Sequence, residues 1–242
     1  MPALIAALAV AGLAAGWPQR AMIASLAVPA GQQEPSCAGC GHPASPPSPW
    51  PRLRRPDPCP DCGRRPSPPA LAAGLATALL LAAATYRVHP WPVLAATAWL
   101  IVVAVPLSVI DLRVHRLPNV LTGSAYAGVV AFLAVAAADA DSWARFSRAA
   151  LGGVILAAGF LLLALLSKGQ IGLGDCKAAA VTGTLLAWYG WDQLLTGTLA
   201  GFLVAGVYGV SLIVRHAATR HSPIPFGPFM FAGALLVVLL AA

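Results

Sequence analysis

The amino-acid sequence predicts an all-α, polytopic membrane protein with about eight transmembrane helices and one cytoplasmic zinc-binding loop. The first indication is composition: 59% of the 242 residues are hydrophobic and only 10% are charged, whereas soluble domains usually contain about 25% charged residues. The second is that the apolar residues fall into segments close to the length of roughly 17–25 residues that spans a bilayer. The third is a single long polar segment, which contains four of the five cysteines. The lipid bilayer is therefore the expected environment of this chain.

Eight apolar segments are expected to form these helices, and the first of them is the least regular. Trp17, Pro18 and Arg20 interrupt it, so its end is predicted either at residue 17 or as far as residue 28. No basic residue precedes its apolar run, and we therefore interpret it as a retained helix and not as a cleaved signal peptide. The eight segments are 3–17, 69–86, 92–110, 118–138, 149–167, 175–190, 193–214 and 225–242.

The basic residues predict the orientation of the helices. If the polar loop 18–68 is cytoplasmic and the spans alternate in direction, twelve of the 15 Lys and Arg residues fall on the cytoplasmic side. These are Arg20, Arg52, Arg54, Arg55, Arg64, Arg65, Arg113, Arg116, Lys168, Lys177, Arg215 and Arg220. Only Arg87, Arg145 and Arg148 fall on the other side. Cytoplasmic loops are enriched in basic residues, so this bias supports the orientation and explains the net charge of +7 without a nucleic acid partner.

The polar loop contains two C-x2-C pairs, Cys37 with Cys40 and Cys59 with Cys62, separated by 18 residues. This spacing is typical of a structural zinc site with four thiolates. The intervening residues are too rich in proline to build a core of their own. Two disulfides are the alternative, but thiols stay reduced in the cytoplasm. The chain thus divides into a first helix (1–17), a zinc-binding loop (18–68) and a membrane-embedded domain (69–242).

Two acidic residues lie where a predicted helix meets the cytoplasmic face. Asp111 ends the third span in PLSVIDLRVHRLPN, and Asp175 begins the sixth span in GLGDCK. The orientation rests on lysines and arginines alone, yet it places both aspartates at one depth on one side. An ionisable residue costs roughly 2.5–3.5 kcal/mol at the centre of a spanning helix and is a candidate functional residue.

Two neighbouring aspartates can act together as an acid and a base. Repulsion between like charges keeps one carboxyl protonated while the other stays ionised. The ionised group can take a proton from water that attacks a peptide carbonyl, and the protonated group can polarise that carbonyl. Gly172 and Gly174 lack side chains, so we expect a substrate backbone to approach Asp175 closely.

Other interpretations of the aspartates remain open. Asp175 could serve only as a helix N-cap, and Asp111 could form a solvated ion pair with Arg113. Paired carboxylates also bind protons or ions in membrane transporters. A transporter would place them near the middle of the bilayer, however, and both aspartates are expected at one edge.

The motifs IDLRVHRLPN and GLGDCK resemble the two aspartate motifs of type IV prepilin peptidases, which are membrane aspartic proteases of the GxGD type. The segment IPFGPFMFAG at 224–233 is similar to the C-terminal part of that family. The two C-x2-C pairs match the zinc-binding cytoplasmic region of its longer, bifunctional members. The resemblance implies that Asp111 and Asp175 are the catalytic pair and that the four cysteines bind zinc.

The resemblance also implies a function. Members of this family cut the basic leader from type IV prepilin or pseudopilin precursors at the cytoplasmic face of the bacterial plasma membrane. Bifunctional members then methylate the new N-terminus with S-adenosylmethionine, through the cytoplasmic region. In this chain that region is short and proline-rich, which puts methyltransferase activity in doubt. A non-catalytic, zinc-containing scaffold of a secretion or pilus machine is a further alternative.

Overall fold

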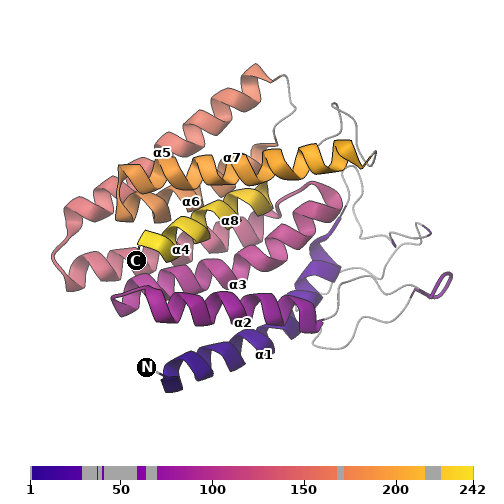
Figure 1. The fold of residues 1–242 in the computed structure, drawn as a ribbon, viewed down its shortest axis with the longest axis horizontal. Coiled ribbons are helices and arrows are strands. Elements are labelled where there is room, and N and C mark those ends of the chain that lie inside the picture. Colours follow the sequence, from indigo (N-terminus) through magenta and orange to yellow (C-terminus); the bar gives the residue numbers. More distant parts are fainter. Residues whose placement is uncertain are drawn as a thin grey trace.

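The computed structural model describes residues 2–28, 37, 40, 59–63, 70–167, 172–215 and 225–241. Within these residues the chain forms eight α-helices and no strand. The helices are α1 (Pro2–Leu26), α2 (Ala70–Arg87), α3 (Trp91–Val114), α4 (Asn119–Asp139), α5 (Trp143–Leu166), α6 (Leu173–Tyr189), α7 (Trp191–Val214) and α8 (Gly227–Ala241). They pack side by side with their axes roughly aligned (Figure 1). The predicted all-α architecture is confirmed, with each helix overlapping one of the apolar segments.

Five of these helices are long and apolar enough to cross a membrane, namely α1, α3, α4, α5 and α7. The other three are shorter, with 18 residues in α2, 17 in α6 and 15 in α8. The prediction of about eight transmembrane helices is therefore correct for the number of helices, but not all of them qualify as spans. In α6 every residue from Val181 to Trp188 is buried, and a helix that is apolar on all sides is one that other helices surround.

Helix α1 continues past the residues that interrupt its apolar pattern and ends at Leu26, close to the longer of the two predicted limits. Pro18 removes one backbone hydrogen bond from the middle of this helix. Gln19, which follows it, is 1% exposed and bonds to α2 and α3. The polar residues therefore do not end the helix, because neighbouring helices accommodate them.

Small residues allow consecutive helices to approach closely. The most extensive contacts join α1 with α2, α3 with α4, α5 with α6, and α7 with α8. A Cβ atom on Gly12 of α1 would lie 2.6 Å from Cα of Ala78 in α2. A Cβ atom on Gly233 of α8 would lie 2.6 Å from the carbonyl oxygen of Gly197 in α7. Such contacts between small residues are the usual basis of helix association in lipid, where burial of apolar surface supplies little driving force.

The alternating direction of the helices brings three helix ends together. The end of α3 and the beginnings of α6 and α8 lie at the same end of the bundle, together with residues 59–63, which precede α2 (Figure 1). Helix α8 contacts both α3 and α6, and α4 contacts α6. At the opposite end, Arg148 of α5 donates to the carbonyl oxygens of Ala187 and Trp188 at 2.8 and 2.7 Å. Arg148 thus satisfies the last turn of α6.

Candidate active site and cysteine cluster

Asp111 lies in the last turn of α3 and is only 4% exposed. His115 ends the helix in a left-handed conformation with φ of 51°, and its N–H donates to the Asp111 carbonyl oxygen at 2.8 Å. One side-chain oxygen of Asp111, Oδ2, accepts a hydrogen bond of 3.2 Å from the backbone N–H of Gly227. Gly227 is the first residue of α8, and the N-terminal end of a helix stabilises a negative charge. The burial of this aspartate is thus offset by the beginning of another helix.

Asp175 is the third residue of α6 and is partly buried. The N-cap of this helix is Gly172, whose carbonyl oxygen accepts a bond of 3.0 Å from the Asp175 N–H. The alternative in which Asp175 is simply the N-cap residue is therefore wrong. A Cβ atom on Gly172 would lie 3.7 Å from Oδ2 of Asp175, so this glycine is adjacent to the carboxylate. The first turn of α6, like that of α8, provides a favourable field for a carboxylate.

The structure brings the two predicted aspartates to the place where the end of α3 meets the beginnings of α6 and α8. Leu117, which is 7% exposed, connects the surrounding elements. A Cβ atom on Gly174 would lie 3.2 Å from Cβ of Leu117, and one on Gly227 would lie 3.4 Å from its Cδ1. The turn after α3 therefore packs against the beginnings of both α6 and α8.

This packing gives Gly174 a structural role beside the one expected from the sequence. The side chain of Leu117 occupies the space that a side chain on Gly174 would need, and the approach of a substrate backbone to Asp175 stays a prediction. Leu117 lies inside the motif IDLRVHRLPN, so its position could have been found from the resemblance, but its contact with Gly174 could not. Gly227 lies inside the segment IPFGPFMFAG, so its position could have been found from the resemblance, but its bond to Asp111 could not.

A second hydrogen bond holds the beginning of α6 in place. Lys177 donates to the side-chain oxygen of Asn119, the first residue of α4, at 2.6 Å. Asn119 follows Leu117 by two residues, so this bond joins α6 to the same connection between α3 and α4. The contact of Gly174 with Leu117 and the hydrogen bond from Lys177 to Asn119 thus hold the turn of α6 that carries Asp175.

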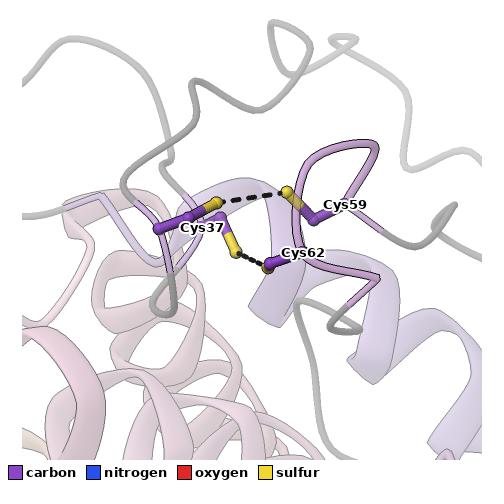
Figure 2. A group of neighbouring side chains, drawn as sticks. Cys37, Cys59 and Cys62 are labelled. Atoms are coloured by element: carbon purple, nitrogen blue, oxygen red, sulfur yellow. Dashed lines mark hydrogen bonds between the residues drawn. The ribbon is translucent and has the colours of Figure 1, made fainter.

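Cys37, Cys40, Cys59 and Cys62 form a second cluster, with their four sulfur atoms all within 4.8 Å of one another. The sulfur atoms of Cys37 and Cys62 are 3.5 Å apart, and those of Cys40 and Cys59 are 3.4 Å apart. In Figure 2 the side chains of Cys37, Cys59 and Cys62 point toward a common centre. These distances exceed the roughly 2.05 Å of a disulfide bond. The donor set and spacing fit a tetrahedral zinc ion, for which a Zn–S bond of about 2.3 Å gives sulfur separations of about 3.8 Å.

Much of the predicted zinc-binding loop lies outside the described residues, as do Lys168 and Arg220 among the basic residues used to predict orientation. The cluster combines one cysteine pair that follows α1 in the sequence, Cys37 and Cys40, with one that precedes α2, Cys59 and Cys62. The prediction that the two C-x2-C pairs form one site is confirmed, and the group could hold a metal ion.

Comparisons with known proteins agree with the resemblance seen in the motifs. A sequence profile of the Type IV leader peptidase family matches residues 94–210, a range that includes Asp111 and Asp175. The chain is 33% identical to the prepilin leader peptidase/N-methyltransferase of Bacillus subtilis over 193 residues, which cover 75% of this chain and 70% of that protein. It is 31% identical to the protein of the same name from Aeromonas salmonicida over 176 residues, or 68% of this chain and 56% of that protein.

A shorter match joins the chain to leader peptidase HopD of Salmonella typhimurium, with 41% identity over 64 residues, covering 26% of this chain and 39% of that protein. No solved structure matches the chain significantly. The match to the Bacillus subtilis protein extends over most of both chains. Together with the family profile, it shows that the chain belongs to the type IV leader peptidase, or prepilin peptidase, family.

Proposed function

We propose that this protein is a membrane aspartic endopeptidase that removes the basic leader from type IV prepilin or pseudopilin precursors. The observation that carries the proposal is the placement of Asp111 and Asp175, two carboxylates from different helices, where the turn after α3 packs against the beginning of α6. The names of the relatives, which include prepilin leader peptidases and a leader peptidase, support the substrate class.

The proposed mechanism uses only the two carboxyl groups and water. One aspartate is ionised and removes a proton from the attacking water, while the other is protonated and polarises the scissile peptide carbonyl. The same two groups then return a proton to the departing amine. A carboxylate has two oxygens, so Asp111 can accept the bond from Gly227 and still take part in proton transfer. The pair titrates as a unit, and we assign neither role to a single aspartate.

The location of the carboxylates favours proteolysis over transport. Asp111 lies in the last turn of α3, and Asp175 lies in the first turn of α6. Both are at helix ends, where a peptide beside the membrane surface can reach them. A transporter would need them near the middle of the bilayer.

The active site is proposed to face the cytoplasm of a bacterial plasma membrane. Arg116 lies two residues beyond the end of α3 and Arg215 directly follows α7, and both helices end at the end of the bundle where α6 begins (Figure 1). Basic residues favour the cytoplasmic side.

The cysteine cluster is proposed to bind a structural zinc ion through Cys37, Cys40, Cys59 and Cys62. With four thiolates the coordination sphere is complete, so such an ion orders the loop and takes no part in peptide cleavage. We do not extend the proposal to N-methylation or to S-adenosylmethionine binding, although the Bacillus and Aeromonas relatives are named for both peptidase and methyltransferase activities.

The proposal is tested by incubating the purified protein with a pilin-like precursor that carries its leader. Asp111→Asn and Asp175→Asn should each lower the cleavage rate by about 10²–10⁴-fold, because each removes one half of the acid–base pair. Asp192→Asn is a matched control, since Asp192 occupies the first turn of α7 as Asp175 occupies that of α6. The control should cleave at the wild-type rate. Rapid cleavage by either Asn variant would contradict the mechanism, and an inactive wild-type protein would contradict the function.

A further inference from the structure

Gln19 is the most completely buried polar side chain of α1, at 1% exposure. Its amide nitrogen donates to the hydroxyl of Thr77 in α2 and to the carbonyl oxygen of Val102 in α3, both at 2.9 Å. Its amide oxygen lies 3.1 Å from the same Thr77 hydroxyl. A buried amide is costly unless its polar atoms are paired. Gln19 is therefore placed where three helices meet, and its amide nitrogen has a partner in each of the other two.

The bond to Val102 has a specific cause in the sequence of α3. In a regular helix the carbonyl oxygen of Val102 accepts the backbone N–H four residues later, but that residue is Pro106, which lies inside the helix. Proline has no N–H, and its ring pushes the carbonyl of the residue four positions earlier out of line. Gln19 supplies, from another helix, the donor that α3 lacks at this turn.

Asp111 follows Pro106 by five residues in the same helix, so a change of helix direction at the interrupted turn would displace Asp111. Five residues of α-helix extend about 7.5 Å, and a rotation of about 10° at the proline moves the far end by about 1 Å. The bond from Gly227 to Asp111 is 3.2 Å long, and a shift of this size breaks or distorts it. Leu107 and Ile110, which lie between the proline and the aspartate, are fully buried, so this segment of α3 is packed against its neighbours.

We propose that Gln19 is a positioning residue for Asp111: by binding the Val102 carbonyl at the proline-interrupted turn, it sets the placement of Asp111 beside Asp175 and Gly227. This inference rests on the proposed peptidase function. It assigns to α1 a part in the active site, although Asp111, Asp175 and Gly227 all lie on other helices.

The test begins with Gln19→Leu, which keeps the approximate size of the side chain and removes its donor. Misplacement of a catalytic group by about 1 Å can cost about 10²-fold in rate, so kcat for precursor cleavage should fall by about tenfold or more. KM should change by less than about twofold, because an interaction that acts on the transition state alone lowers kcat. The control is Thr85→Val in α2, because Thr85 is equally buried but its hydroxyl bonds to Leu81 of its own helix. This control should retain the wild-type kcat.

Substitution of the proline makes the test specific. In Pro106→Ala the new N–H can pair with the Val102 carbonyl, so the helix no longer needs a donor from α1. Adding Gln19→Leu to Pro106→Ala should then reduce kcat by much less than Gln19→Leu does alone. Amide hydrogen exchange in residues 107–114 should follow the same order, with faster exchange in Gln19→Leu and less acceleration in the double variant. Exchange needs no substrate, so it tests the contact even if the wild-type protein cleaves no precursor.

The possible outcomes separate the two proposals. A wild-type protein that cleaves no pilin-like precursor contradicts the proposed function, whatever the exchange data show. A Gln19→Leu variant with wild-type kcat and exchange overturns the positioning role. So does an equal loss when Gln19→Leu is made in the wild-type protein and in Pro106→Ala, which would show that Gln19 acts through packing alone. If Gln19→Leu fails to insert, recovery of folded protein by Pro106→Ala supports the pairing, and failure with and without Pro106→Ala overturns it.

Discussion

The carboxylate of Asp111 lies so close to the backbone of Gly227 that a Cβ atom on Gly227 would collide with it. A Cβ atom on Gly227 would lie 2.9 Å from Oδ2 of Asp111 and 3.4 Å from Cδ1 of Leu117. The first of these distances is shorter than Cβ atoms tolerate, so a side chain at this position must move the carboxylate. The same residue donates the hydrogen bond that Asp111 receives. Residue 227 thus controls Asp111 through both its N–H and its lack of a side chain.

We therefore expect Gly227→Ala to lower precursor cleavage by about 10–10²-fold, since it displaces one carboxylate from the other. Cleavage is measured by the mobility shift of the precursor on a gel, with protein abundance in the membrane measured in parallel. Gly206→Ala in α7 is the control, because a Cβ atom there has nothing within 4 Å. Wild-type cleavage by Gly227→Ala would show that this contact does not position Asp111.

The four cysteines of the cluster come from two short segments of the chain, one after α1 and one before α2. Because the cysteines converge to within 4.8 Å from pairs separated by 18 residues, a shared metal ion is the simplest reason for their arrangement. A proline-rich stretch with few apolar residues gains little from burial, so the free energy of metal binding would be the main source of order in the loop.

Metal analysis of the purified protein should find about one zinc ion per chain, the stoichiometry expected for a four-thiolate site. Cys37→Ser or Cys59→Ser should release the zinc and expose the 41–58 stretch to proteolysis. Cys176→Ser is the control for zinc content, because Cys176 lies in α6 and outside the cluster. Precursor cleavage should be weakened and not eliminated, since the aspartates lie on other helices. A zinc-free preparation with intact thiols and full activity would contradict a structural metal.

In the whole molecule, the alternating direction of the helices places two groups of charged residues at opposite ends of the bundle. Asp139 ends α4 at the far end of the bundle, whereas Arg116 follows α3 at the end that holds Asp111 and Asp175. If the positive-inside bias sets the orientation, these two positions lie on opposite sides of the membrane.

A thiol reagent that cannot cross membranes should therefore label a cysteine introduced beside Asp139 in intact cells. It should label a cysteine introduced beside Arg116 only after the membrane is permeabilised. The parent protein, with its own five cysteines, sets the background for both measurements. The reverse pattern would place the aspartates on the outer face, where they could not meet a leader before export.

The features that sequence analysis predicted correctly depend on residue type and local spacing. Eight helices follow from eight apolar segments, because a chain in lipid must satisfy its backbone hydrogen bonds within each segment. The two C-x2-C pairs predict a common cluster because thiolates at this spacing have few other uses. The placement of Asp111 and Asp175 at one end of the bundle follows from the alternation of spans. The expectation that needed correction, that all eight helices span the membrane, concerns how a helix is surrounded and not which residues form it.

The sequence by itself thus determined the helical membrane architecture, the two candidate aspartates and the four cysteines, because hydropathy and ligand spacing are properties of short segments. Only the tertiary structure decided that Leu117 fills the space beside Gly174, that Gly227 holds Asp111, and that Gln19 completes the turn broken by Pro106. The last two contacts join residues that are 116 and 83 positions apart. Such contacts depend on how helices pack against one another, and the local sequence of one helix does not specify which residues of another helix it contacts.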